Sequence, residues 1–381
     1  MNLQETEMNP SASGPLLDAA AWRRVTQRAE QLCAHGQFPG MALEVHRGDR
    51  RTGVRAFGRL GPDAADVLPD DAIFLVASLT KPIVAMASLL LVERGELALN
   101  DRVADLIPDF SGADRKSMTI RHLLTHTSGL PDMLPNNRAL REKQSPLSGF
   151  VSGSCGVTLD FPPGRGVQYQ SMGFALLGQI INQISGVPYG EFLRREFFEP
   201  LGMRDSALSP TVEWLREPSR AARMAQNRLP PDQIGTDWGW NSDYWRTLGA
   251  PWGGLLTTVH DLGRYCRMML NEGTLGSVRV LSAATVRAAT SNQLECLHDM
   301  PEADRRTRAW GFGWRFNWTS HSTCFSDLLS DDVYGHWGAT GTLFWMDRRS
   351  ETAAIMLSTQ PMDMGSGAEL TRLSNMIAAS L

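Results

Sequence analysis

Lysine is scarce in this sequence. The chain of 381 residues contains 37 Lys plus Arg, and the three that are lysine are Lys81, Lys116 and Lys143. Almost every cation is therefore an arginine, which cannot lose its proton in a protein, whereas the pKa of a desolvated lysine can fall until the amine serves as a base near neutral pH. A lysine next to a buried serine is consequently the best candidate in this sequence for a side chain that accepts a proton.

Long apolar runs and basic tracts are also missing. The longest apolar run, residues 84–92, is too short to cross a bilayer and is interrupted by Ser88. The formal net charge of -4 and the lack of a basic tract give no indication of a nucleic-acid partner. Residues 1–7 include acidic side chains and no apolar stretch, so we expect neither a secretory signal nor a membrane partner.

The cysteines are few and odd in number. They are Cys33, Cys155, Cys266, Cys296 and Cys324. No two form a C-x-x-C pair, so free thiols in a reducing cytoplasm are the simplest interpretation. His122 and His126 lie four residues apart without a third ligand nearby, which favours structural hydrogen bonds over a metal site. We therefore expect a cytoplasmic protein with no metal and no cofactor.

Strand-like patterns lie near both ends of the chain, and helical patterns lie between them. The strand-like segments are residues 41–46, 51–58, 310–318, 341–347 and 352–359. One antiparallel sheet built from both termini and flanked by helices is therefore expected, with a helical middle inserted. The sequence thus predicts an α/β (α+β) fold.

This pattern divides the chain into two parts. Residues 16–80 and 300–381 are expected to form the α/β sheet domain, and residues 81–299 the large, mostly helical domain. Within the latter, residues 131–168 contain many Pro, Gly and Ser and are expected to be loop. The polar residues 1–15 are expected to be disordered.

Ser78 and Lys81 stand three residues apart where a helix is expected to begin. Positions i and i+3 share a helix face, so both side chains would point into the same space. Pro82 fits only in the first turn, where its missing N–H costs nothing. The pattern Ser-x-x-Lys occurs once in the chain. On this pattern alone, the simpler interpretation is that Ser78 caps a helix and Lys81 is a solvated first-turn residue.

Two further segments carry chemically useful residues. Tyr169 follows the Gly-rich turn Phe161-Pro162-Pro163-Gly164-Arg165-Gly166 and precedes a helical pattern, so its phenol can be presented to a ligand. His336-Trp337-Gly338 lies on an expected strand, where Gly338 would let a ligand approach the backbone closely.

These three segments together resemble the serine β-lactamase and penicillin-binding-protein-like family, in its class C, D-alanyl carboxypeptidase and family VIII carboxylesterase branch. Ser78-x-x-Lys81 is similar to the first motif of that family, Tyr169-Gln170-Ser171 to the second and His336-Trp337-Gly338 to the third. The segment Leu124-Thr125-His126-Thr127-Ser128-Gly129-Leu130 also looks like that family. The resemblance covers roughly residues 35–375, and it implies an active site at the junction of the two domains.

The resemblance implies a role for each motif residue. Ser78 would be the nucleophile, with Lys81 and Tyr169 sharing the proton transfers. The backbone N–H groups of Ser78 and Ala339 would form the oxyanion hole. The expected substrate-binding residues are Ser171, His336, Trp337 and Gly338. For His336, a local hydrogen bond on the strand is an equally good interpretation.

Two departures from the family pattern bear on the substrate. Trp337 stands where members that act on penicillins have a hydroxyl residue, and Ser171 stands where lactamases usually have Asn. Both changes favour esters with apolar parts, so we expect a serine carboxylesterase that acts on a small-molecule ester through an acyl-enzyme. The alternatives are a β-lactamase, a D-amino-acid peptidase or an acyltransferase with the same site, or a non-catalytic binding protein. The oligomeric state is left unassigned.

Overall fold

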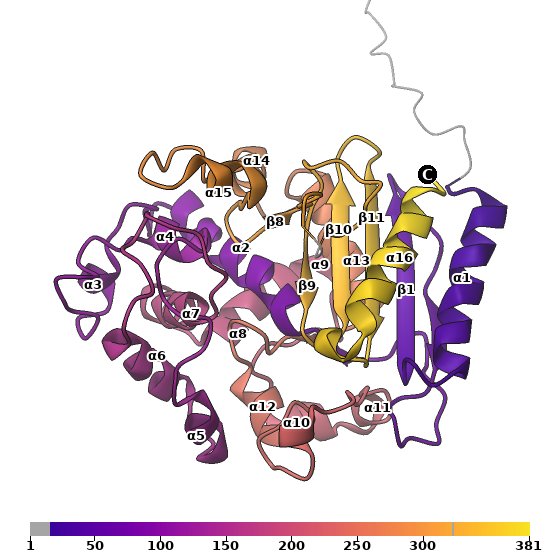
Figure 1. Cartoon of the computed structure of the whole chain (residues 1–381). Helices are drawn as coiled ribbons and strands as arrows, with labels where there is room; N and C mark the ends of the chain where they lie inside the picture. Colours follow the sequence, from indigo (N-terminus) through magenta and orange to yellow (C-terminus); the bar gives the residue numbers. More distant parts are fainter. Residues whose placement is uncertain (1–15, 322–323) are drawn as a thin grey trace, which may run out of the picture.

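A seven-stranded antiparallel sheet forms the centre of the computed structural model, which describes residues 16–321 and 324–381 (Figure 1). Its main path runs β2-β1-β11-β10-β9-β8, and β3 pairs with β1. The strands are β1 (Gly40–Arg47), β2 (Arg50–Arg51), β3 (Arg55–Gly58), β8 (Arg315–Phe316), β9 (Tyr334–Gly338), β10 (Thr342–Asp347) and β11 (Thr352–Ser358). Strands from both ends of the sequence are therefore neighbours in one sheet.

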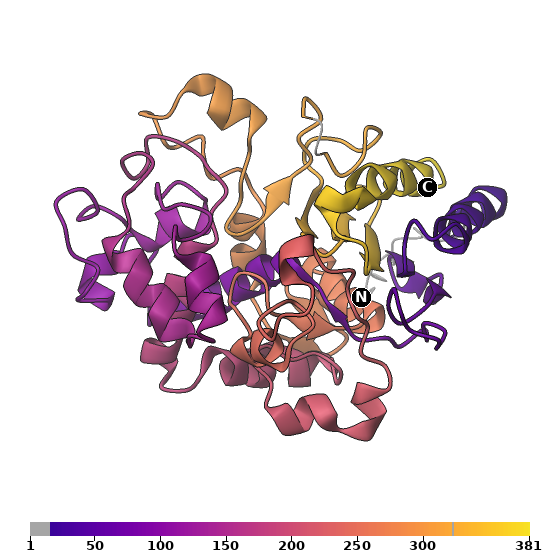
Figure 2. The same cartoon turned by 60° about the horizontal axis from the view of Figure 1, so that its bottom comes forward.

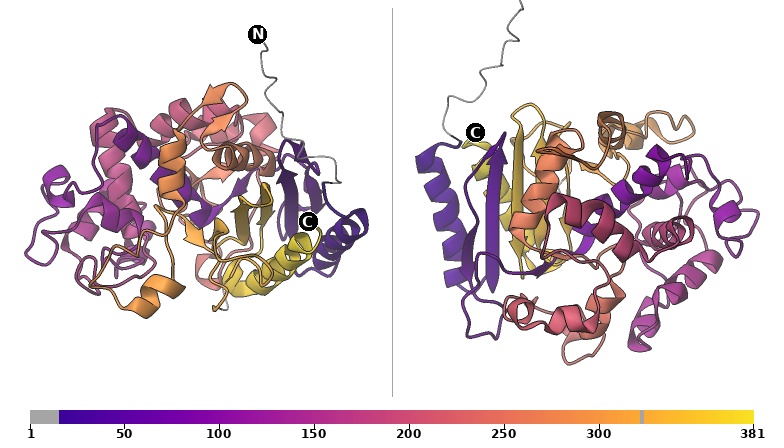
Figure 3. Two further views of the ribbon diagram at one scale, coloured as in Figure 1. Left: turned by 90° about the horizontal axis from the view of Figure 1, so that it is seen from above. Right: turned by 180° about the vertical axis from the view of Figure 1, so that it is seen from behind.

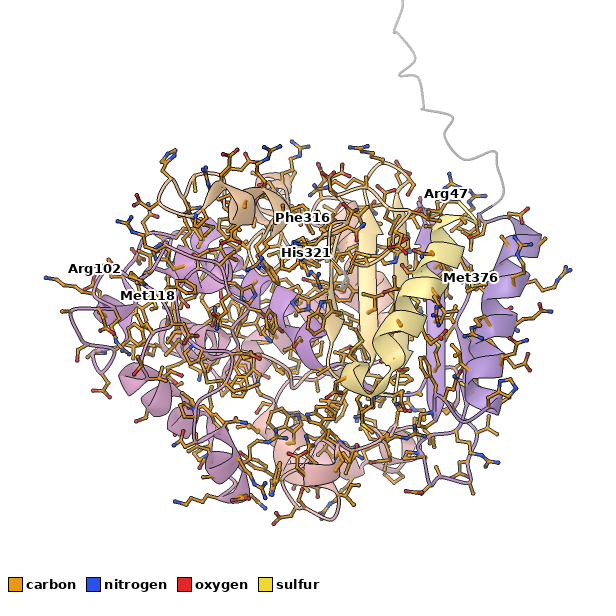
Figure 4. The ribbon with its side chains drawn as sticks, viewed as in Figure 1. Arg47, Arg102, Met118, Phe316, His321 and Met376 are labelled. Carbon is orange, nitrogen blue, oxygen red and sulfur yellow. The ribbon has the colours of Figure 1, made fainter. Side chains whose placement is uncertain are left out.

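The first and last helices cover one face of this sheet. Helix α1 (Ala19–Ala34) and helix α16 (Ser366–Ala378) lie side by side there (Figures 1 and 3). Asp18 caps α1 by accepting a hydrogen bond from the Ala21 N–H at 2.7 Å. Buried apolar side chains of both helices pack on those of β1, β10 and β11, and the partly buried Met376 of α16, labelled in Figure 4, packs against them. This apolar layer holds the two chain ends together.

The other face carries α13 (Val259–Leu270), and beyond it lies the helical part of the molecule (Figures 1 and 2). Helix α2 (Thr80–Glu93) is buried along most of its length, because its residues are almost all apolar. It contacts α7 (Met172–Ser185) on the helical side and follows the short 3-10 helix η1 (Ala77–Leu79), which contacts β9 and β10. α2 therefore connects the sheet with the helical part.

The remaining elements are short. The helices are α3 (Val103–Leu106), α4 (Ile120–Leu124), α5 (Asn137–Glu142), α6 (Leu147–Gly156), α8 (Tyr189–Leu193), α9 (Glu199–Leu201), α10 (Val212–Arg216), α11 (Pro218–Ala221), α12 (Asp243–Leu248), α14 (Ala283–Ala289) and α15 (Glu302–Thr307). The strands are β4 (Phe74–Leu75), β5 (Leu256–Thr257), β6 (Thr274–Leu275) and β7 (Val278–Arg279). A π-helical turn (Arg194–Phe198) joins α8 to α9, and the 3-10 turns are η3 (Pro231–Gln233) and η4 (Met362–Met364).

The expected fold class is confirmed, and two local expectations are wrong. Residues 131–168 are not all loop, since they contain α5 and α6; α6 packs on α7 and buries Phe150 and Val151. The expected strand 310–318 is only β8, because the chain bends before it. Gly313 takes φ +74° there and lies so close to Ala85 that a Cβ would overlap that side chain.

Three other expectations have different outcomes. The division into a domain of residues 16–80 and 300–381 and one of residues 81–299 stays a proposal. Residues 1–15 lie outside the described part of the chain. Within the described residues, no helix is both long and apolar enough to cross a membrane.

Candidate active site

Ser78 lies in η1, at the entrance to α2. The preceding Ala77 takes the left-handed φ of +47°, a conformation that costs free energy for a residue with a side chain. Thr80 holds it there and is itself held by Leu255. The Thr80 hydroxyl donates to the Ala77 carbonyl at 2.7 Å and accepts the Leu255 N–H at 3.0 Å. Ser78 itself is half-buried, so its hydroxyl is fixed on a constrained turn and remains accessible.

Lys81 is buried directly beside Ser78. Its Nζ donates to Ser78 Oγ at 3.1 Å and to the Trp252 carbonyl at 2.8 Å. Burial lowers the pKa of the amine from 10.5 to about 7, and the negative charge of Asp132 opposes part of that effect. Near neutral pH, a substantial fraction of Lys81 is therefore the free amine, which can accept a proton.

The β9–β10 turn clamps the backbone that leads to Ser78. The Thr340 hydroxyl donates to the Leu75 carbonyl at 2.8 Å, and the Thr342 hydroxyl donates to the Val76 carbonyl at 2.8 Å. These two bonds join the end of the sheet to the segment before η1. The segment that leads to Ser78 is thus held by the strand pair that includes His336, Trp337 and Gly338.

Gly338 allows this close approach. A Cβ at this position would overlap the Val76 carbonyl and the Thr342 hydroxyl, and it would press on Ala77. The absence of a side chain therefore lets β9 lie against η1. Ala339, the next residue, is half-buried in the β9–β10 turn, and its N–H stays the predicted second donor of the oxyanion hole.

Tyr169 lies over Lys81. The Lys81 Nζ is 4.6 Å from the centroid of the tyrosine ring. The phenol oxygen is buried and makes no hydrogen bond of standard geometry to any residue that the structure describes, although Ser78 is close enough to lower its pKa somewhat. Burial, with a further effect of Asp132, nevertheless raises the pKa of Tyr169 far above its usual range, so the phenol keeps its proton. The rings that surround it are His126, Trp310, His336 and Trp337.

His336 makes a local hydrogen bond on its strand and also lies beside Tyr169, so it fits both roles that the sequence left open. Its Nδ1 lies 2.7 Å from the Trp337 carbonyl, which can only accept, so Nδ1 carries the proton. Its ring also faces Tyr169 at a centroid distance of 5.9 Å, and its buried Nε2 has no hydrogen-bond partner within residues 16–321 and 324–381. Burial holds the pKa of His336 well below its usual range, which leaves the imidazole neutral. Trp337 stacks on Tyr169 at 5.8 Å and contributes an apolar wall.

Ser171 is hydrogen-bonded to Asp132, a residue that the sequence did not single out. Its hydroxyl donates to Asp132 Oδ1 at 2.6 Å, and its N–H donates to the Asp132 carbonyl at 3.2 Å. Asp132 and Trp252 are the two partners at this site that sequence reasoning missed. Trp252 acts through its backbone carbonyl, which carries no sequence signal, and Asp132 follows the Ser128-Gly129-Leu130 segment that was already noted.

The two histidines of the helical part hold the local backbone. His122 Nδ1 accepts the Thr119 N–H at 3.1 Å, which closes the first turn of α4, and His126 Nδ1 accepts the Gln170 N–H at 3.1 Å. His126 thereby fixes the residue after Tyr169. No cluster of three metal-ligating side chains occurs in the described ranges 16–321 and 324–381.

The three motifs therefore meet in space. Ser78, Lys81 and Tyr169 come from η1, from α2 and from the segment before α7, and the glycine of β9 faces them. A half-buried hydroxyl, a partly neutral amine and a protonated phenol are the groups that nucleophilic attack with proton relay requires. Such an arrangement can transfer an acyl group.

Known proteins resemble this chain over most of its length. A family model described as Beta-lactamase matches residues 25–377. Penicillin-binding protein 4 of Amycolatopsis lactamdurans is 32% identical to this chain over 339 residues, which cover 86% of this chain and 81% of that protein.

Two solved structures share the fold. A penicillin-binding protein homologue from Caulobacter crescentus superposes with a TM-score of 0.76 at 20% identity, over 95% of this chain and 97% of the other. A family VIII carboxylesterase superposes with a TM-score of 0.73 at 18% identity, over 94% of this chain and 98% of the other. The two structures show the shared fold. The matched family model and the relative at 32% identity establish that the chain belongs to the β-lactamase family.

Proposed function

We propose that this chain is a serine hydrolase that cleaves carboxylic esters through an acyl-enzyme on Ser78. The observation that carries the proposal is the Lys81 amine, fully buried, 3.1 Å from Ser78 Oγ and with its pKa lowered to about 7. A base whose pKa lies near the working pH takes a proton most effectively in the transition state.

In the proposed reaction, Ser78 Oγ attacks the ester carbonyl while Lys81 takes its proton. The tetrahedral oxyanion would be stabilised by the N–H groups of Ser78 and Ala339, each such donor contributing about 10²–10³ in kcat. The proton then passes to the leaving alcohol, with Tyr169 positioned above Lys81 to take part. Water, activated by the same groups, releases the acid and restores the Ser78 hydroxyl.

The walls of the site support an ester with apolar parts. Trp337 stacks beside Tyr169, where it offers an aromatic face and a single donor. The hydroxyl of Ser171 is engaged by Asp132 and is not a free substitute for an amide. One similar protein is named a penicillin-binding protein, and one structure of the same fold is named a carboxylesterase. The experiment below therefore includes amide and β-lactam substrates as well as esters. The free cysteines also support a reducing compartment, and we propose the cytoplasm.

The test is turnover of a substrate panel by wild type, Ser78→Ala and the control Ser117→Ala, which changes an exposed serine. The panel contains p-nitrophenyl butyrate, nitrocefin, a D-amino-acid peptide, and an ester with an added alcohol as acyl acceptor. We expect ester hydrolysis by wild type and Ser117→Ala and none by Ser78→Ala. Ser78→Ala hydrolysis at the wild-type rate would refute the proposal, and preferential turnover of nitrocefin or the peptide would replace the ester with that substrate class.

A further inference from the structure

One carboxylate at the edge of the site has no part in the proposed reaction. Asp132 is exposed, yet two hydrogen bonds from Ser171 hold it. The Ser171 hydroxyl donates to the Asp132 carboxylate at 2.6 Å, and the Ser171 N–H donates to the Asp132 backbone carbonyl at 3.2 Å. Ser171 is itself buried and stands two residues after Tyr169. The Asp132 carboxylate is therefore held in a fixed position relative to the tyrosine.

The negative charge of Asp132 affects the pKa values of Lys81 and Tyr169. It is the group that opposes the effect of burial on the pKa of Lys81, and it adds to the effect of burial on the pKa of Tyr169. A second charge, Arg315, acts on Tyr169 in the opposite sense. Arg315 is buried, however, with its guanidinium 4.1 Å from the Trp318 ring centroid. Of these two charges, the accessible one is negative.

The side chain of Asp132 also keeps acceptor capacity. Among the residues that the structure describes, it receives one hydrogen bond, on Oδ1 from Ser171, and it forms no ion pair. A carboxylate has about four acceptor positions on its two oxygens, so Oδ2 remains available to a ligand. Because the carboxylate is already oriented, binding a cation there costs little further ordering.

We propose that Asp132 makes the enzyme prefer substrates that carry a positively charged group near the scissile ester, on the acyl part or on the alcohol part. This inference rests on the proposed function and adds a substrate class to it. An accessible ion pair contributes up to about 1 kcal/mol. That free energy corresponds to a preference of about fivefold in kcat/KM for the cationic substrate.

Two pairs of isosteric esters test the charge alone. For the acyl part, the pair is the p-nitrophenyl ester of trimethylammonioacetate and that of 3,3-dimethylbutanoate. For the alcohol part, it is butyrylcholine and 3,3-dimethylbutyl butyrate. The quantity measured is the cationic-to-neutral ratio of kcat/KM in wild type, in Asp132→Asn, which keeps an acceptor for Ser171, and in the control Asp109→Asn, which removes an exposed carboxylate beside α3.

We expect Asp132→Asn to lower the ratio about fivefold in at least one pair, which identifies the part that bears the charge, and Asp109→Asn to leave it unchanged. The wild-type ratio should also fall as salt rises from about 20 mM to 0.5 M, because an exposed ion pair is screened. If Asp132→Asn does not fold, Asp132→Ser takes its place in the same measurement, because only a change at residue 132 separates its charge from the net charge of -4.

Two results would overturn the inference, and they are distinguishable. In the first, hydrolysis still requires Ser78, but the cationic-to-neutral ratio of kcat/KM in both substrate pairs is unchanged by Asp132→Asn, or is unchanged by salt. Asp132 then does not select for charge, and the proposed function stands. If Ser78→Ala hydrolyses all four esters as fast as wild type does, the proposed function fails and the inference fails with it.

Discussion

Replacing Lys81 with methionine should make the protein more stable and inactive. A fully buried lysine whose pKa falls from 10.5 to about 7 destabilises the folded state by about 5 kcal/mol wherever the amine is protonated in both states. Methionine has a similar length and no charge, and it forfeits the two hydrogen bonds to Ser78 and Trp252, each worth about 1 kcal/mol. The expected net gain in the free energy of unfolding is about 3 kcal/mol at pH 6.

The sign of the pH dependence follows from the direction of the shift. Because the folded-state pKa of Lys81 is lowered, the unfolded chain binds more protons than the folded chain between about pH 7 and pH 10.5. The stability of wild type therefore rises with pH across this window. The advantage of Lys81→Met is largest below pH 7 and shrinks as the pH approaches 10.5.

Urea denaturation at pH 6, 7.5 and 9 measures this effect, with Lys143→Met as the control because Lys143 is exposed. The control should change the free energy of unfolding by less than about 0.5 kcal/mol. Ester turnover by Lys81→Met should fall by about 10²–10⁴, the usual contribution of a general base. A Lys81→Met protein that is no more stable than wild type at pH 6, or whose gain does not depend on pH, would refute the reasoning.

Two further predictions concern the sheet. Gly338→Ala should lower kcat/KM on p-nitrophenyl butyrate by about 10²-fold or more, because the new Cβ displaces the Val76 carbonyl and with it the segment that carries Ser78. The control is Gly156→Ala, at a position where a Cβ meets no other atom of the described residues. Near-wild-type turnover by Gly338→Ala would contradict the prediction. Burial raises the pKa of Glu44, but its bonds to His46 and Arg51 outweigh that effect and hold the pKa below its usual range. Glu44→Gln should therefore cost about 1.5–3 kcal/mol at pH 7, the usual contribution of hydrogen bonds to a charged group, and progressively less below about pH 4.5. Thermal unfolding that shows the same loss at pH 7 and at pH 4 would contradict this prediction.

Local patterns predicted part of the site. The simpler interpretation of Lys81 as a solvated first-turn residue is wrong, because Lys81 is fully buried in α2. The i, i+3 spacing of Ser78 and Lys81 puts both on one side of the η1–α2 junction, and the amine does reach the hydroxyl. The apolar alternation near both termini predicted one sheet, and β1 does pair with β11. In both cases the sequence signal comes from residues that are close in the chain or from faces that must be buried together.

What the sequence could not predict depends on contacts between distant segments. The Trp252 carbonyl meets Lys81 across 171 residues, and a backbone acceptor leaves no trace in the residue type. Asp132 meets Ser171 across 39 residues. Helix α6 forms in a stretch rich in Ser and Gly because burying Phe150 against α7 outweighs its weak helix propensity.

Covalent labelling shows whether Ser78 is a nucleophile activated by Lys81. The protein is treated with a fluorophosphonate at pH 8, and the modified residue is located by peptide mass spectrometry. The account predicts one label, on Ser78, and much slower labelling of Lys81→Met. A label on another residue, or an unmodified Ser78 in a preparation that hydrolyses p-nitrophenyl butyrate, would contradict it.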